Sequence, residues 1–193
     1  MGYFLLEEEK VCHIYKDTEK ALDKTIAHVV QLLDRNHRTI ATAESCTGGL
    51  LSQLVTSVPG ASHVFELGLC TYAERMKTRL LGVPEQLIAD CGVVSAEVAS
   101  AMVHGLRQQS GADLCLSVTG LAGPGGGTPE QPVGTVFMGI LWGEQEAVAH
   151  LQLWRYGLQT REEIRRGTAM CAFGIAESTL MEEAECRMKK KPL

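Results

Sequence analysis

The chain carries at residues 39–49 the sequence Thr39-Ile40-Ala41-Thr42-Ala43-Glu44-Ser45-Cys46-Thr47-Gly48-Gly49, in which a short β-prone run leads directly into a polar, glycine-containing turn. Beyond this turn, Leu50, Leu51, Leu54 and Val55 lie at helical spacing, and Pro59-Gly60 ends the pattern. The stretch therefore predicts a strand, a tight turn and a helix, the repeating unit of α/β domains.

The rest of the chain alternates in the same way. Apolar spacing predicts helices at about residues 18–36, 74–81, 84–90 and from Thr160 onward, and Ser95 is placed to cap another helix that contains Val98, Met102 and Leu106. Strands are expected at about 64–73, 113–119, 133–142 and 147–154. The fold class predicted is α/β, a three-layer α/β/α sandwich with a mixed, mainly parallel sheet, because the last two strands lie too close together for a parallel crossover.

The length of 193 residues indicates one domain. We expect residues 1–17 to form an N-terminal arm or hairpin, residues 18–185 the α/β/α domain, and residues 186–193 a basic tail. Two apolar patches, at residues 3–6 and 11–15, are available to cover a sheet edge or to make a dimer contact.

The charge of the chain excludes some classes of function. With 18 basic and 23 acidic side chains the net charge is −5, which argues against a general nucleic-acid binder. No run approaches the ~18–20 apolar residues of a membrane span, and Glu7-Glu8-Glu9 interrupts any signal segment. We therefore expect a soluble, cytoplasmic protein that binds neither nucleic acid nor membrane.

The seven cysteines are odd in number and include no C-x-x-C pair, and most lie within apolar stretches. Reduced, buried thiols explain this better than a disulfide framework. The six histidines are scattered singly, whereas a zinc site needs paired ligands at short spacing. We predict no metal site and no cofactor.

Two loops have the composition of ligand-binding segments. In the first, residues 44–49, hydroxyl groups lie beside helix N–H groups that favour negative charge, such as an oxyanion or a phosphate. An ordinary helix N-cap explains the same residues. In the second, residues 117–128, the lysine of a phosphate-binding P-loop and the third glycine of a dinucleotide fingerprint are missing. What remains is a glycine loop at the end of a strand, which is either a ligand site or a plain surface loop.

Taken together, the motifs of the chain resemble those of the CinA C-terminal domain family. The resemblance rests on five segments in the family's order and spacing, between about residues 22 and 178: Thr42–Gly49, Gly68–Tyr72 with Lys77, Gly92–Ser95, Thr119–Pro124 and Pro132–Val136. It implies an amidohydrolase that converts nicotinamide mononucleotide to nicotinate mononucleotide and ammonia without a metal. It also implies the stand-alone form of a domain that longer relatives carry behind a nucleotide-processing domain.

The same resemblance suggests the catalytic residues. Ser45 matches the proposed nucleophile, and Tyr72 and Lys77 match the groups that would activate it. A lysine base must be neutral, so its pKa must be lowered by desolvation or by a neighbouring cation. Family members often have Ser-Asn where this chain has Ala73-Glu74, and a carboxylate at Glu74 would raise the pKa of Lys77. Cys46 is an alternative nucleophile, although a small residue that fills the turn is the simpler interpretation.

The substrate would be a small pyridine mononucleotide, and its phosphate needs donors. The expected substrate-binding residues come from the two loops and from the start of the last helix, where an arginine fork suits a phosphate: Thr47, Gly48, Gly49, Thr119, Gly120, Gly123, Arg161 and Arg165. Solvated helix arginines, balanced by Glu162 and Glu163, explain the last helix equally well.

Two other functions remain open at this stage. In the first, the altered residues 73–74 leave a non-catalytic nucleotide-binding module. In the second, the chain is a competence- or damage-linked interaction protein, as the family name suggests. We expect a homo-oligomer, taken as a dimer.

Overall fold

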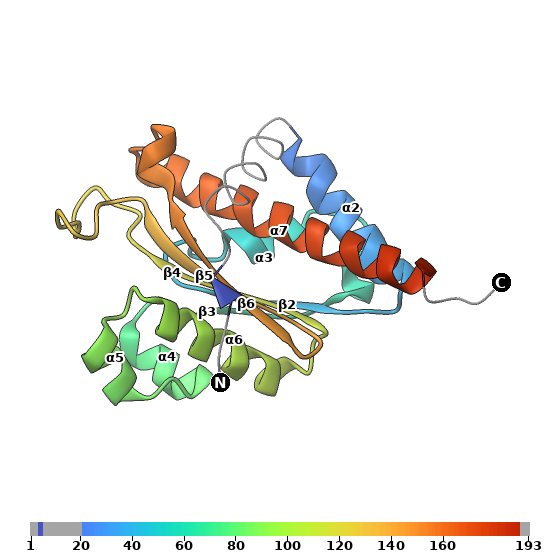
Figure 1. Ribbon diagram of the computed structural model, residues 1–193, viewed down its shortest axis with the longest axis horizontal. Coiled ribbons are helices and arrows are strands. Elements are labelled where there is room, and N and C mark those ends of the chain that lie inside the picture. Colours follow the sequence, from blue (N-terminus) through green and yellow to red (C-terminus); the bar gives the residue numbers. More distant parts are fainter. Residues whose placement is uncertain (1–3, 6–20, 190–193) are drawn as a thin grey trace.

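The computed structural model describes residues 4–5 and 21–189 of the chain (Figure 1). Six strands form one sheet, whose order is β1-β6-β5-β4-β2-β3. In chain order they are β1 (Phe4–Leu5), β2 (Ile40–Glu44), β3 (Phe65–Cys70), β4 (Leu114–Gly120), β5 (Thr135–Trp142) and β6 (Gln145–Gln152). Among the described strands, only β5 is antiparallel to both of its neighbours. Strands β3, β2 and β4 are parallel to one another, so the expected mixed, mainly parallel sheet is confirmed.

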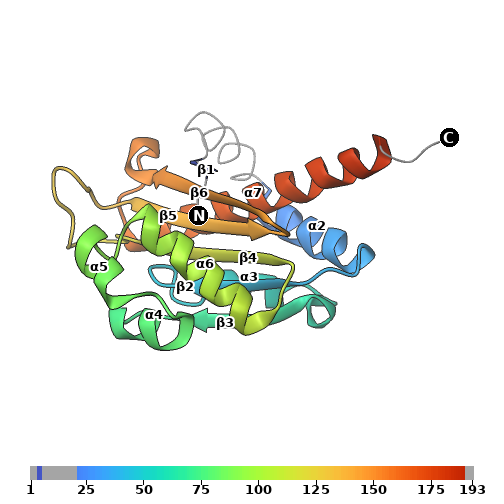
Figure 2. The ribbon, with the colours of Figure 1, turned by 60° about the horizontal axis from the view of Figure 1, so that its bottom comes forward.

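Helices cover both faces of this sheet and give the three expected layers (Figures 1 and 2). One layer contains α4 (Glu74–Leu81), α5 (Glu85–Cys91) and α6 (Ala96–Ser110). The other contains α2 (Leu22–Arg35), α3 (Leu50–Thr56) and the long α7 (Arg161–Lys189). Two short 3-10 turns, η1 (Ala61–His63) and η2 (Leu153–Tyr156), complete the described elements.

The central strands separate two hydrophobic cores. Alternate residues of β2 face opposite layers: Ile40 packs with α2, α3 and α7, while Ala41 and Ala43 pack with α6. The apolar stripe of α2, which includes Ile26 and Val29, is covered by α7. All five residues of β2 are buried, which explains its lack of a polar face.

In the layer formed by α4, α5 and α6, which lies below the sheet in Figure 1, the backbones of α6 and α4 approach each other closely. A Cβ added at Gly105 would lie 1.8 Å from the carbonyl oxygen of Leu81. Only glycine permits this approach, and it holds the end of α4 against α6. Helix α4 carries Lys77, so this contact bears on the position of the expected base.

The element boundaries differ from the sequence expectation in three places. Strand β3 ends at Cys70 rather than near residue 73, because the chain turns there toward α4. Residues 153–156 form a 3-10 turn instead of the end of a strand. Helix α7 continues to Lys189, into the segment predicted as a tail.

Of the expected N-terminal arm, only the two residues of β1 are described. They pair in parallel with Ala147 and Val148 of β6, at the edge of the sheet. The rest of that predicted segment, including residues 11–15, lies outside the described residues. Within the described part of the chain, no helix has the length and apolar character needed to cross a membrane.

Candidate active site

A pocket of about 240 Å³ opens where β2, β3 and β4 reach their carboxyl ends, the usual ligand position in α/β sheets. Three residues at the carboxyl ends of these strands meet here: Ser45 directly follows β2, Tyr72 is the second residue after β3, and Gly120 ends β4. The start of α4 and the start of α7 close its sides. The described lining residues are Ser45, Cys46, Tyr72, Glu74, Lys77, Val93, Val94, Thr119, Gly120, Leu121, Ala122, Gly123, Gly125 and Arg161.

Ser45 and Lys77 are hydrogen-bonded partners in this pocket. The Nζ atom of Lys77 donates to Ser45 Oγ over 2.9 Å and to the carbonyl oxygen of Thr71 over 2.8 Å. The Ser45 amide in turn donates to the carbonyl of Val118 on β4, which ties the serine to the sheet. Two residues 32 positions apart are thereby brought within proton-transfer distance.

The Lys77 side chain is completely buried, with 0% of its surface exposed. Desolvation lowers the pKa of Lys77 from its ordinary value of 10.5, while the nearby groups Cys46, Glu74 and Cys70 oppose this by raising it. Glu74 therefore acts in the direction expected from the sequence, but desolvation outweighs it. The net direction favours the neutral amine, which is the form that can accept a proton.

Cys46 adjoins Ser45 and lines the same pocket, but its thiol is a poor nucleophile. Burial raises the pKa of Cys46 to about 12, so the thiolate is scarce at neutral pH. Its side chain is 6% exposed and packs in the core above the sheet. The interpretation of Cys46 as a space-filling residue therefore fits the geometry better than the alternative.

The turn after Ser45 differs from the sequence expectation of free helix N–H groups. The carboxylate of Glu44 accepts hydrogen bonds from the amides of Gly49, Leu51 and Ser52 at 2.8–3.0 Å and from Ser52 Oγ at 2.7 Å. These amides of the seven-residue α3 are consequently occupied by a group of the protein itself. Gly48 and Gly49 have φ angles of +61° and +95°, which glycine adopts without strain.

The glycine loop forms the opposite wall of the pocket. Thr119 Oγ1 donates to the carbonyl of Val93, and Gln131 Nε2 donates to the carbonyl of Val94, so the loop is tied to the residues before α6. Among the described residues, no acceptor is hydrogen-bonded to the amides of Ala122 and Gly123. These two amides are candidate donors to a bound oxyanion or phosphate.

Arginines of α7 approach the site from the other layer. Arg161 lines the pocket, and its Nη1 atom lies 3.4 Å from the hydroxyl of Tyr72, whose side chain is 60% exposed. Arg165 instead donates from Nε and Nη2 to the carbonyl of Thr47, over 2.9 and 2.7 Å. Glu163 does not balance either arginine, because its carboxylate accepts from the amides of Gln159 and Thr160 in a capping box.

The predicted residues thus fall into two groups. Ser45, Tyr72, Lys77, Thr119, Gly120, Gly123 and Arg161 line one pocket. Thr47, Gly48, Gly49 and Arg165 are not among its described lining residues; Thr47 is fully buried, and Gly49 bonds to Glu44.

Sequence reasoning missed three contributions to the site. Glu44 has no distinctive local pattern besides its place before Ser45, and Thr71 acts through its backbone carbonyl, which any residue could supply. Val93 and Val94 form an apolar wall of the pocket, but the sequence indicated them only as part of a family motif and gave no sign that they line the site. In the described residues no group of three or more metal-ligating side chains is present.

Comparisons with known proteins identify the family that the chain resembles. A family model described as "CinA C-terminal domain" matches residues 22–180. A CinA-like protein of Geobacter metallireducens is 49% identical over 139 residues, which are 72% of this chain and 33% of that protein. A CinA-like protein of Thermotoga maritima is 45% identical over 161 residues, which are 83% of this chain and 37% of that protein. The chain thus spans about a third of the length of the curated relatives it matches.

Solved structures are similar over most of their length. The competence/damage inducible protein CihA from Agrobacterium tumefaciens has a TM-score of 0.77 and 33% identity, covering 81% of this chain and 93% of that chain. A CinA superfamily protein from Klebsiella pneumoniae has a TM-score of 0.78 at 24% identity, covering 83% and 98%, which indicates a shared fold.

Proposed function

The chain belongs to the CinA C-terminal domain family, and on that premise we propose that it is an amidohydrolase that converts nicotinamide mononucleotide to nicotinate mononucleotide and ammonia. The observation that carries the proposal is the 2.9 Å contact between Ser45 Oγ and the buried Nζ of Lys77. A serine hydroxyl becomes a useful nucleophile only beside a base, and a desolvated lysine is one.

The two residues can carry out both halves of the reaction. Neutral Lys77 accepts the hydroxyl proton as Ser45 Oγ bonds to the carboxamide carbon. The protonated lysine then donates that proton to the nitrogen as the carbon–nitrogen bond breaks, and ammonia leaves. A water molecule attacks the resulting ester by the same route, Lys77 receiving its proton and returning one to Ser45 Oγ as nicotinate mononucleotide is released. The second hydrogen bond of Lys77 Nζ, to the Thr71 carbonyl, holds the amine in position beside Ser45.

The remaining lining groups suit a substrate of this kind. The amides of Ala122 and Gly123 are available to stabilise the oxyanion, while Arg161 offers a cation for the phosphate at the edge of the pocket. Tyr72, next to Arg161 and largely exposed, offers a ring and a hydroxyl to the substrate. An anionic ligand is thereby attracted by local groups despite the net charge of −5.

The proposal is tested by incubating the purified chain with nicotinamide mononucleotide and measuring ammonia and nicotinate mononucleotide. Wild-type protein should release both in equal amounts, and Ser45→Ala should release neither above background. Ser57→Ala is the matched control, because Ser57 is an exposed serine just after α3. Activity that persists in EDTA supports a metal-independent reaction, and equal rates for wild type and Ser45→Ala would refute the nucleophile.

A non-catalytic nucleotide-binding module is the second candidate, and the carboxylate of Glu74 favours it. Glu74 lines the pocket and raises the pKa of Lys77, which lowers the fraction of Lys77 that is neutral and able to accept a proton. This alternative predicts that nicotinamide mononucleotide raises the melting temperature without turnover. Glu74→Gln would then restore ammonia release, whereas an active wild-type protein excludes the alternative.

A further inference from the structure

The turn that carries Ser45 is held from inside the fold by Glu44. The Glu44 side chain is 0% exposed, and both of its oxygens are occupied by α3 and its first residues. Ser52, one of its partners, also bonds Thr42 Oγ1 at 2.8 Å, so the network reaches back into β2. The carboxylate therefore fixes where the chain leaves β2 and where it enters α3.

The same turn is held from the other side by Arg165. Both Nε and Nη2 of its guanidinium converge on one acceptor, the carbonyl oxygen of Thr47, two residues after Ser45. The contact joins segments 118 positions apart and is close: a Cβ added at Gly48 would lie 3.7 Å from Arg165 Nη2. Arg165 is only partly exposed and is not among the lining residues described for the Ser45 pocket.

We propose that Arg165 is a positioning residue for the Ser45 nucleophile, acting together with Glu44, rather than a ligand of the substrate phosphate. The inference rests on the proposed function for its chemistry, but the geometry that carries it is independent of the substrate. Thr47 is only two residues after Ser45 in the chain. A rotation of the Thr47 carbonyl group therefore moves Ser45 Oγ away from Lys77 Nζ. A displacement of about 1 Å at a reacting atom can cost on the order of 100-fold in rate.

The phosphate role and the positioning role make different kinetic predictions. A phosphate ligand contributes to substrate binding, so its loss raises KM. A residue that holds the nucleophile in place acts on the chemical step, so its loss lowers kcat with little change in KM. The geometry favours the second, because two of the three guanidinium nitrogens of Arg165 already donate to Thr47.

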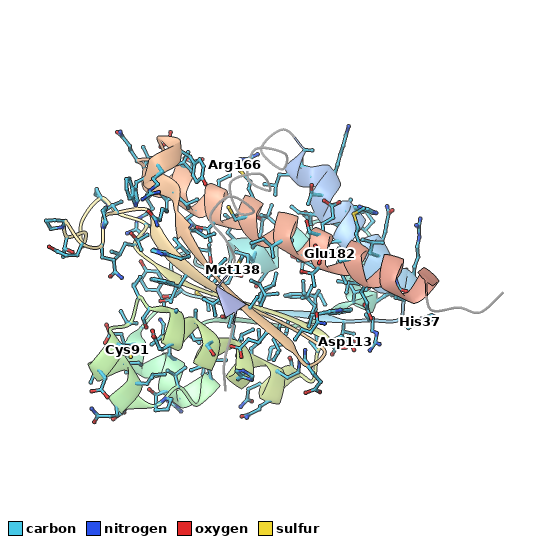
Figure 3. The ribbon with its side chains drawn as sticks, in the orientation of Figure 1. His37, Cys91, Asp113, Met138, Arg166 and Glu182 are labelled. Carbon is cyan, nitrogen blue, oxygen red and sulfur yellow. The ribbon has the colours of Figure 1, made fainter. Side chains whose placement is uncertain are left out.

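The test uses Arg165→Met and Arg165→Lys in the full chain, with Arg166→Met as the matched control. Arg166 is the next residue on α7, is exposed, and is labelled in Figure 3. With nicotinamide mononucleotide, Arg165→Met should lower kcat by roughly 10- to 100-fold and change KM by less than about threefold. Arg165→Lys should recover part of kcat, since an ammonium group can still donate to the Thr47 carbonyl but lacks the planar fork. Arg166→Met should behave as wild type.

A second measurement decides the question without turnover. Crystal structures of wild type and Arg165→Met report the distance between Ser45 Oγ and Lys77 Nζ. The proposal predicts a distance near 2.9 Å in the wild type and a lost hydrogen bond in the variant. An unchanged distance in the variant overturns the proposal, and so does a large rise in KM with kcat preserved. If the wild-type chain releases no ammonia, the proposed function fails, and the two crystal structures still decide the role of Arg165.

Discussion

Replacing Glu44 by glutamine preserves the shape of a buried side chain while removing its charge and one of its two acceptor oxygens. In the wild type, Oε2 accepts from the amides of Gly49 and Leu51, and Oε1 accepts from the amide and hydroxyl of Ser52. The glutamine oxygen can take only one of these two positions. In its best orientation, the glutamine side chain directs its oxygen to the amides of Gly49 and Leu51 and its NH₂ group to Ser52. The Ser52 hydroxyl then accepts a hydrogen bond from this NH₂ group and donates its own proton to Thr42 Oγ1.

The cost of Glu44→Gln follows from this count. The amide of Ser52 loses a charged acceptor in a partly buried position, which costs about 1.5–3 kcal/mol. The remaining three hydrogen bonds become neutral and lose part of their strength, at roughly 0.5–1 kcal/mol each. We therefore expect Glu44→Gln to lower the free energy of unfolding by roughly 3–6 kcal/mol, a large part of the ~5–15 kcal/mol of a typical domain.

Urea unfolding measures this loss. The chain has two tryptophans, Trp142 buried and Trp154 partly exposed, so fluorescence and far-UV circular dichroism give two records of the transition. The control is Glu66→Gln, the same substitution at an exposed position of β3. It should change the free energy of unfolding by no more than about 0.5 kcal/mol. A loss below about 1 kcal/mol in Glu44→Gln would refute the hydrogen-bond network described around α3.

Three further variants test the site and the packing. In Lys77→Met, ammonia release should fall by about 10²- to 10⁴-fold. The pKa of Lys77 is lowered in the folded chain, so just below pH 10.5 the unfolded chain binds one proton more than the folded chain. In this pH range the free energy of unfolding of the wild type, relative to that of Lys77→Met, should therefore rise with pH by at most about 1.4 kcal/mol per pH unit. Urea unfolding in which this difference falls as the pH rises would contradict the prediction. Cys46→Ala should retain ammonia release within about threefold, since its thiol pKa is about 12, and a loss comparable to Ser45→Ala would make the thiol the nucleophile. Gly105→Ala should lower the free energy of unfolding by about 2–3 kcal/mol despite its better helix propensity, because the new Cβ meets the Leu81 carbonyl; an unchanged melting temperature would exclude that close approach.

The layers of the fold were predictable because each element has a strong local pattern. The apolar stripe of α2 and the alternation of strand and helix around residues 39–55 depend on spacing, which the sequence displays directly. The order of strands in the sheet was not predictable in the same way. The antiparallel pairing of β5 with β6 was predicted from their short connection, whereas the pairings of β5 with β4 and of β1 with β6 depend on contacts between more distant segments.

The candidate site divides along the same line. Ser45 and the glycine loop could be identified because turns and glycines have positional meaning. The burial of Lys77 could not be predicted from its own helix, where it lies among charged residues. It results from the packing of α4 against α6. Glu163 shows the opposite case. The pattern Thr160-x-x-Glu163 predicts a capping box, whereas we had expected Glu163 to balance the arginines of the helix.

The packing of α2 against α7 has a consequence for the order of synthesis. Helix α2 leaves the ribosome early, but the helix that covers its apolar stripe is the last element of the described chain. During translation the core between the sheet and helices α2 and α3 therefore stays exposed to water until α7 emerges. Since α7 also supplies Arg161 to the pocket and Arg165 to the Ser45 turn, an incomplete chain lacks both arginines. Closure of the core and completion of the pocket thus coincide, because both depend on the same last helix.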